Sequence, residues 1–157
     1  MNVLRVVRRF ALVIGALAGT AYAQTAGCNN GSLTGTFMFT ISGQILAPAA
    51  TAGPVSGVVM TTFDGFGNLS QVDHVLHNGV APVEDWRPAT GSYSVNTDCT
   101  GTFTFTPQPT VPADNSPALK VYFVICKGGT QINAVVSGSP TAAAFAASIL
   151  STGTRLF

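Results

Sequence analysis

Charged side chains are scarce in this chain of 157 residues: they make up 8% of it, whereas hydrophobic residues make up 46%. So little charge and so much apolar content exclude an intrinsically disordered protein. No basic footprint is present, so nucleic acid is not expected as a partner. Hydroxyl and amide groups must keep such a surface soluble, and the low charge leaves homo-oligomerisation open.

Long hydrophobic runs are also missing, because the apolar stretch Phe10 to Ala18 is too short to span a bilayer. It follows three basic residues, Arg5, Arg8 and Arg9. It precedes Ala21-Tyr22-Ala23, a small-x-small cleavage site. The pattern predicts a signal peptide over residues 1–23, a single domain over 24–157, and export to the periplasm or the medium. No transmembrane segment is expected in the mature chain.

Removal of this signal changes the charge balance, because it leaves four basic residues against six acidic ones, a net charge of −2. Lipidation at Cys28 is an alternative to the cleavage after Ala23. It is disfavoured because Thr25 stands where a lipoprotein signal has a Leu-like residue.

Cysteines are few, and the three that follow the signal allow one disulfide and one free thiol in an exported protein. Cys126 ends the apolar run Val121 to Ile125, where a buried thiol is expected. We predict that Cys28 pairs with Cys99. This bond would close a loop of about 70 residues, worth about 4 kcal/mol in loop-closure entropy.

Sustained helical periodicity is absent, and alternating patterns separated by turn signals take its place. Turns are predicted at Asp64-Gly65-Phe66-Gly67-Asn68 and at Asn78-Gly79. Segment 142–150 fits a helix or a closing strand equally well. Strands are predicted at 33–41, 58–63, 69–77, 80–86, 91–96, 101–106, 119–126 and 130–136. The predicted fold is all-β, a single antiparallel up-and-down barrel of about eight strands, with a β-sandwich as the alternative.

A short pattern of Gly, then Ser or Thr, then an aromatic residue recurs at 35–39, 91–95 and 101–105. The glycine permits a bend or a close approach, and the aromatic residue then fills the core. The spacings are unequal, so the pattern is a strand-start device and not a solenoid repeat.

Several of these elements carry a resemblance: Leu33-Thr34-Gly35-Thr36-Phe37, Phe63-Asp64-Gly65-Phe66-Gly67-Asn68, Gly91-Ser92-Tyr93-Ser94-Val95-Asn96 and Asp98-Cys99-Thr100-Gly101. Together they resemble a group of small secreted bacterial proteins of unknown function, over most of the mature chain. More distantly, the strand order is similar to that of calycin-like barrels, the lipocalins and allene-oxide-cyclase-like proteins. The resemblance implies a barrel and brings no catalytic residues with it.

The strand at 69–77 carries the candidate acid-base chemistry. One of its faces has Val72, His74 and Leu76, and the other has Asp73, Val75 and His77. Because the first face is more apolar, we expect His74 to point into the barrel, where it could act as a general acid or base. The alternative is a core or rim histidine that is hydrogen-bonded to a neighbour. Asp73 and His77 could share a metal with a third ligand, but no ligand spacing elsewhere supports this. Neither a metal nor a cofactor is expected.

The loop Glu84-Asp85-Trp86-Arg87-Pro88 has the densest polar chemistry. Trp86 could close over a ligand at the barrel mouth, with Arg87 offering its fork to a carboxylate. In the alternative, Trp86 covers one barrel end and Asp85 pairs with Arg87.

These patterns favour an exported, non-enzymatic barrel that binds a small apolar molecule in its lumen or mouth. The expected ligand contacts are Phe37, Phe39, His74, Trp86, Arg87, Tyr93, Phe103 and Phe105. Two alternatives stay open. One is a filled structural or surface-interaction barrel, which would have no cavity larger than a few waters. The other is a cyclase or isomerase that moves a proton with His74. No Gly-x-Ser-x-Gly motif is present, and no catalytic residue is assigned.

Overall fold

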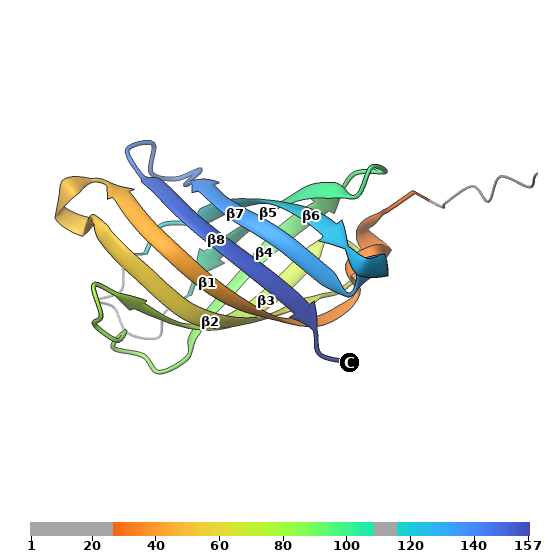
Figure 1. Cartoon of the computed structure of the whole chain (residues 1–157), viewed down its shortest axis with the longest axis horizontal. Helices are drawn as coiled ribbons and strands as arrows, with labels where there is room; N and C mark the ends of the chain where they lie inside the picture. Colours follow the sequence, from red (N-terminus) through yellow and green to blue (C-terminus); the bar gives the residue numbers. More distant parts are fainter. Residues whose placement is uncertain (1–26, 109–115) are drawn as a thin grey trace, which may run out of the picture.

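Eight antiparallel strands close into a barrel in the computed structural model of the chain (Figure 1), which describes residues 27–108 and 116–157. Each strand pairs with the next along the chain, and β8 pairs with β1 to close the sheet. The strands are β1 (Gly35–Ala47), β2 (Gly53–Phe63), β3 (Asn68–His77), β4 (Arg87–Val95), β5 (Thr100–Pro107), β6 (Leu119–Cys126), β7 (Gln131–Gly138) and β8 (Ala146–Arg155). Three short 3-10 helices are η1 (Asn30–Leu33), η2 (Ala49–Thr51) and η3 (Lys127–Gly129). The predicted all-β up-and-down barrel is confirmed, whereas the proposed signal peptide lies outside the described residues.

The observed strands differ from the predicted ones in several places. β1 continues past its predicted end at Ile41 to Ala47, and β2 begins at Gly53 instead of Val58, so part of the expected loop 47–57 is strand.

Residues 81–86, most of the predicted strand 80–86, form an irregular connection. Pro82 cannot donate to a strand ladder, and Val83 and Trp86 are exposed, so no alternating face is buried. The next strand begins at Arg87 instead. The ambiguous segment 142–150 ends in β8, because β1 would otherwise present an unpaired edge.

The barrel end that carries the N-terminal η1 is closed by side chains. Leu33 of η1 is fully buried, and the Tyr93 hydroxyl donates a hydrogen bond to the Asn30 carbonyl at 3.0 Å. Arg155 at the end of β8 places its guanidinium 5.1 Å from the ring centre of Phe37. The same guanidinium donates to the carbonyl of Ser32 at 2.9 Å and to that of Gly129 at 3.0 Å. Thus η1 seals this end as a hydrogen-bonded plug.

Aromatic rings fill the interior next to this plug. The ring of Phe63 lies edge-on to the rings of Phe37, Tyr93 and Phe103, with centroid separations of 5.7, 4.9 and 6.1 Å. Such edge-to-face contacts stabilise beyond the area they bury. The recurring Gly-Ser/Thr-aromatic pattern therefore does fill the core. Its glycine is required at Gly101, where a Cβ atom would collide with the ring of Phe123.

The predicted disulfide between Cys28 and Cys99 is present and joins residues 71 positions apart. It ties the segment before η1 to the β4–β5 turn, where the Cys28 amide also donates to the Thr97 carbonyl at 3.2 Å. Cys126 is a free, half-buried thiol. A disulfide is typical of exported proteins. No helix in the described part of the chain is long and apolar enough to cross a membrane.

The predicted turn between β2 and β3 is held by the carboxylate of Asp64. Its Oδ1 accepts hydrogen bonds from the backbone N–H groups of Phe66, Gly67 and Asn68 at 2.7, 2.9 and 3.0 Å. Its Oδ2 accepts from the Asn68 side-chain amide at 2.7 Å. These bonds, led by the one from the Asn68 side chain, lower the pKa of Asp64 from the ordinary 3.8 to about 2.

Replacing Asp64 with leucine is expected to destabilise the barrel by several degrees in Tm at neutral pH, because the turn amides lose their acceptor. In the wild type the stabilisation from Asp64 is fully present above pH 3.8 and is lost as the pH falls through about 2. Thermal unfolding from pH 2 to pH 7 checks this. A variant whose Tm deficit is the same at both ends would contradict the assignment.

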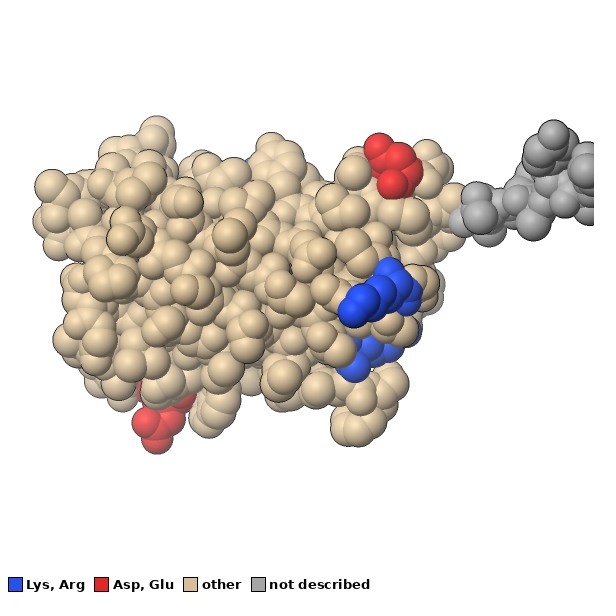
Figure 2. Space-filling model, viewed as in Figure 1, with Lys and Arg blue, Asp and Glu red and all other residues tan. Residues whose placement is uncertain are grey.

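The outer wall of the barrel carries hydroxyl, amide and scattered apolar side chains and little charge. Figure 2 shows one face in which Lys, Arg, Asp and Glu form only small, separate groups. Exposed apolar residues on the wall include Met38, Val58, Met60, Tyr122, Val135 and Leu150. The scarcity of charge in the sequence is therefore a property of the folded surface.

Candidate functional site

The half of the barrel opposite η1 holds a cavity of about 600 Å³. It lies at the end that carries the β1–β2, β5–β6 and β7–β8 connections (Figure 1), because residues of all three connections line it. Examples are Thr51, Pro117 and Ala142. The strands continue past the aromatic core at this end, but no plug comparable to η1 fills the space between them among the described residues.

Most of the cavity wall is apolar and comes from alternate residues of the strands. The apolar wall consists of Phe39, Ile41 and Ile45 of β1, Val55 and Val59 of β2, Val75 of β3, Phe103 and Phe105 of β5, Leu119 and Val121 of β6, Val136 of β7, and Phe145 and Ile149 at β8. The two phenylalanines of β5 join this wall to the aromatic core, since their rings lie 6.2 Å apart.

A polar strip crosses the same cavity from β2 to β4. Thr61 Oγ1 donates to Gln71 Oε1 at 3.1 Å, and Gln71 Nε2 donates to Asp73 Oδ2 at 3.2 Å. The other carboxylate oxygen, Asp73 Oδ1, accepts from Nε of Arg87 at 3.1 Å and lies 3.0 Å from its Nη2. Arg87 Nη1 donates to Ser116 Oγ at 2.7 Å. Thr61, Gln71, Asp73, Arg87 and Ser116 therefore form one continuous hydrogen-bonded chain, called the polar strip below.

Charge within the strip is balanced and removed from water. The side chain of Asp73 is 2% exposed and that of Arg87 is 15% exposed. The register explains the pairing, because Asp73 and Arg87 are directly opposite each other on β3 and β4. A buried carboxylate is tolerated when a cation and further hydrogen bonds compensate its desolvation, and Arg87 and Gln71 supply both.

His77 is the remaining titratable side chain among the described residues that line the cavity. It ends β3 at the mouth, about 13 Å along the strand from Asp73 at ~3.3 Å per residue. Its Nε2 is buried, and no group among the described residues forms a hydrogen bond with it. His77 and Asp73 are thus two separate polar positions along one wall.

Four of the residues expected at the site line the cavity: Phe39, Arg87, Phe103 and Phe105. Phe37 and Tyr93 do not, because they belong to the aromatic core at the closed end. The guanidinium group of Arg87, which was expected to bind a ligand carboxylate, instead binds the carboxylate of Asp73. The alternative pairing of Asp85 with Arg87 is not observed either.

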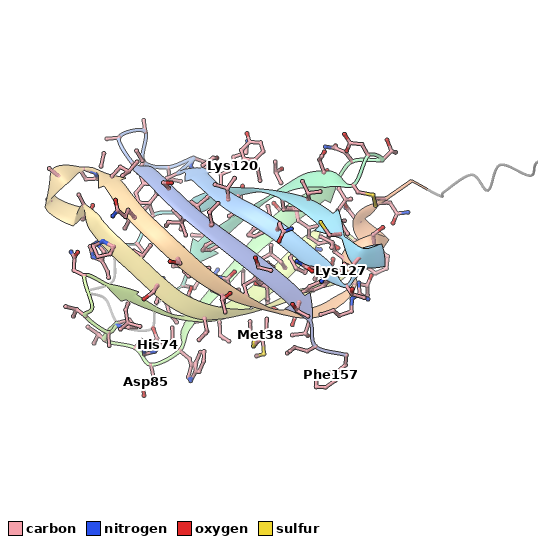
Figure 3. The ribbon with its side chains drawn as sticks, in the orientation of Figure 1. Met38, His74, Asp85, Lys120, Lys127 and Phe157 are labelled. Atoms are coloured by element: carbon pink, nitrogen blue, oxygen red, sulfur yellow. A yellow bond between two sulfur atoms is a disulfide. The ribbon has the colours of Figure 1, made fainter. Side chains whose placement is uncertain are left out.

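The expectation that His74 points into the barrel is wrong. His74 lies on the outer face, where its Nδ1 is 2.6 Å from the carbonyl oxygen of Asp85 and its ring packs at 6.1 Å from that of Trp86. Figure 3 shows His74 and Asp85 outside the barrel wall. Trp86 is 55% exposed and does not cover the mouth. The reason is the register: Leu69, paired with buried Phe63, faces inward, so Gln71 and Asp73 do too.

Sequence reasoning missed Thr61, Gln71 and Ser116, and it treated Asp73 only as a candidate metal ligand. The sequence did contain a clue to the polar strip. Leu69 follows the turn directly after β2 and pairs with the inward Phe63, so alternation along β3 places Gln71 and Asp73 on the inner face. No three His, Cys, Asp or Glu side chains within residues 27–108 and 116–157 are grouped so that they could hold a metal ion.

Comparison with protein-family models, with curated proteins and with solved structures finds no match for this chain. The closed eight-stranded barrel is compatible with a calycin-like fold. The resemblance to small secreted bacterial proteins stays a prediction.

Proposed function

We propose that this protein binds a small apolar molecule inside the barrel. The observation that carries the proposal is the cavity of about 600 Å³ with its mainly apolar wall. Ligand sites usually have volumes of about 300–1,000 Å³, a hydrophobic lining and a few placed polar groups. The polar strip and His77 supply the polar groups here.

A barrel filled by its own side chains would serve only as a scaffold. That description suits the closed half, where rings and η1 occupy the interior. It does not suit the open half, because the described side chains there leave a cavity of about 600 Å³, far larger than a few waters need. The size of this cavity favours binding over a purely structural role.

The cyclase or isomerase alternative rested on a proton-moving His74 in the lumen. His74 contacts Trp86 and Asp85 on the outer face, so this alternative lacks its base. Asp73 is engaged by Arg87, and His77 is about 13 Å further along β3 at ~3.3 Å per residue. Among the residues that the structure describes, no facing acid and base groups support catalysis, and we favour a binding protein. The disulfide supports its export.

Titration with N-phenylnaphthylamine, a neutral dye that fluoresces in apolar surroundings, tests the proposal. We expect saturable binding by the wild type. Replacing Val136, which lines the cavity, with tryptophan should weaken dye binding at least about tenfold, because the indole occupies ligand space.

The matched control is Val135→Trp, one position away on β7 and exposed on the outer wall. This variant should bind the dye as the wild type does. Absence of saturable binding by the folded wild type, or equal losses in the two variants, would refute binding in the lumen. Circular dichroism establishes that both variants are folded.

A further inference from the structure

We propose that the cavity selects uncharged ligands and that Asp73 is the built-in counter-ion that enforces this choice. The ligand class is an apolar molecule with a hydroxyl, carbonyl or ester oxygen, and not a carboxylate. This inference rests on the proposed function and specifies its ligand.

The cation of the described cavity wall already has an anion. Arg87 is the one Lys or Arg among the described residues that line the cavity. Two of its nitrogens, Nε and Nη2, lie 3.1 and 3.0 Å from the same oxygen of Asp73. An anionic ligand would therefore have to displace Asp73 from Arg87 or enter without a counter-charge.

Asp73 is also fixed in place. Its side chain is 2% exposed, so it cannot turn into water when a ligand arrives. Its second oxygen is held by Gln71, which is in turn held by Thr61, and both neighbours are buried. Displacing Asp73 would break this chain and leave a buried carboxylate without Arg87.

An uncharged ligand can bind to the polar strip at a lower desolvation cost than a carboxylate can. A hydroxyl or carbonyl oxygen can exchange hydrogen bonds with the amide, hydroxyl and guanidinium groups of the strip without adding net charge. A carboxylate would lose its hydration and place a second anion near Asp73 in a poorly solvated space. The remaining lining is apolar and suits the hydrocarbon part of either molecule, so the polar end decides between them.

The test uses three ligands with one hydrocarbon chain: dodecanol, methyl dodecanoate and dodecanoate. Each ligand is titrated at neutral pH against protein that holds N-phenylnaphthylamine, and its Kd is obtained from the displacement of the dye. The concentrations stay below the micelle concentration of dodecanoate. For the wild type we expect the Kd of dodecanoate to exceed that of dodecanol at least about tenfold. Methyl dodecanoate should follow dodecanol.

The decisive variant is Asp73→Asn, which keeps the shape of the side chain and removes its charge. It removes the negative charge that faces a ligand carboxylate beside Arg87, so the ratio of the Kd of dodecanoate to that of dodecanol should fall at least about tenfold. The matched control is Asp85→Asn, the same change of charge at an exposed residue outside the cavity wall. It should leave the ratio unchanged.

The outcomes test the selection of uncharged ligands, the role of Asp73 and the proposed function separately. Dodecanoate binding to the wild type as tightly as dodecanol would overturn the selection of uncharged ligands. An unchanged ratio in folded Asp73→Asn would overturn the role of Asp73. Should this variant not fold, Asp73→Ser, which also removes the charge, takes its place, and the wild-type ratio still decides the selection. Failure of the dye itself to bind would instead refute the proposed function.

Discussion

Replacing both Cys28 and Cys99 with serine is expected to lower the free energy of unfolding by about 4 kcal/mol. The disulfide joins residues 71 positions apart, so its loss frees a long loop in the unfolded chain. In the folded state it anchors the segment that leads into η1, whose Leu33 and Asn30 seal the closed end. Urea unfolding followed by circular dichroism measures the change. For a domain of this size the Tm should fall by about 10 °C.

Cys126→Ser is the matched control, because Cys126 is a free, half-buried thiol with only weak sulfur contacts to Val124 and Asn133. It should cost less than about 1 kcal/mol. Equal stability of the double variant and the wild type would contradict the expected role of the bond. The intact mass of the protein purified from its natural host, before and after reduction, tests the bond and the predicted cleavage after Ala23 together.

The closed half of the barrel could largely be predicted from the sequence. Alternation and turn chemistry are local properties, so the inward Phe37 and Phe39 and the turn at Asp64 could be recognised without knowing the fold. The predicted cysteine pairing used the apolar run before Cys126, which marks that cysteine as a buried free thiol and leaves Cys28 and Cys99 to pair. Sequence patterns are reliable here because each depends on a few neighbouring residues.

The open half could not be predicted from the sequence in the same way, and β3 shows why. Its outer residues Val72 and Leu76 are more apolar than the inner Gln71 and Asp73, so a rule that places the apolar face inward chooses the wrong face. A polar strip inside a barrel violates that rule. Violations of this kind are expected at functional sites, where local preference gives way to a required chemistry.

The pair of Asp73 and Arg87 needed information beyond any local pattern. The two residues are opposite each other only because of the β3–β4 register. An irregular connection of no standard length separates the two strands, so the register could not be counted from the sequence. Ser116 enters the strip from yet another connection. Long-range pairing assembled this part of the site.

Replacing Arg87 with methionine is expected to lower the free energy of unfolding by about 3–5 kcal/mol. Methionine keeps much of the side-chain volume but removes the charge that compensates Asp73. The carboxylate, 2% exposed, would keep its hydrogen bond from Gln71 and lose both contacts with the guanidinium. Urea unfolding at neutral pH measures the loss.

Two further variants separate loss of the pair from loss of a cation. Lys120→Met removes a cation that lies over the ring of Tyr122 on the outer wall, and it should cost less than about 1 kcal/mol. The double variant Asp73→Leu with Arg87→Met removes both charges and should recover most of the stability lost in Arg87→Met, because no buried carboxylate remains. A double variant as unstable as Arg87→Met would mean that packing by Arg87 matters more than its charge. Recovery would show that the pair of Asp73 and Arg87 contributes little net stability compared with apolar side chains of similar size, so that the single variant loses stability mainly through the uncompensated carboxylate.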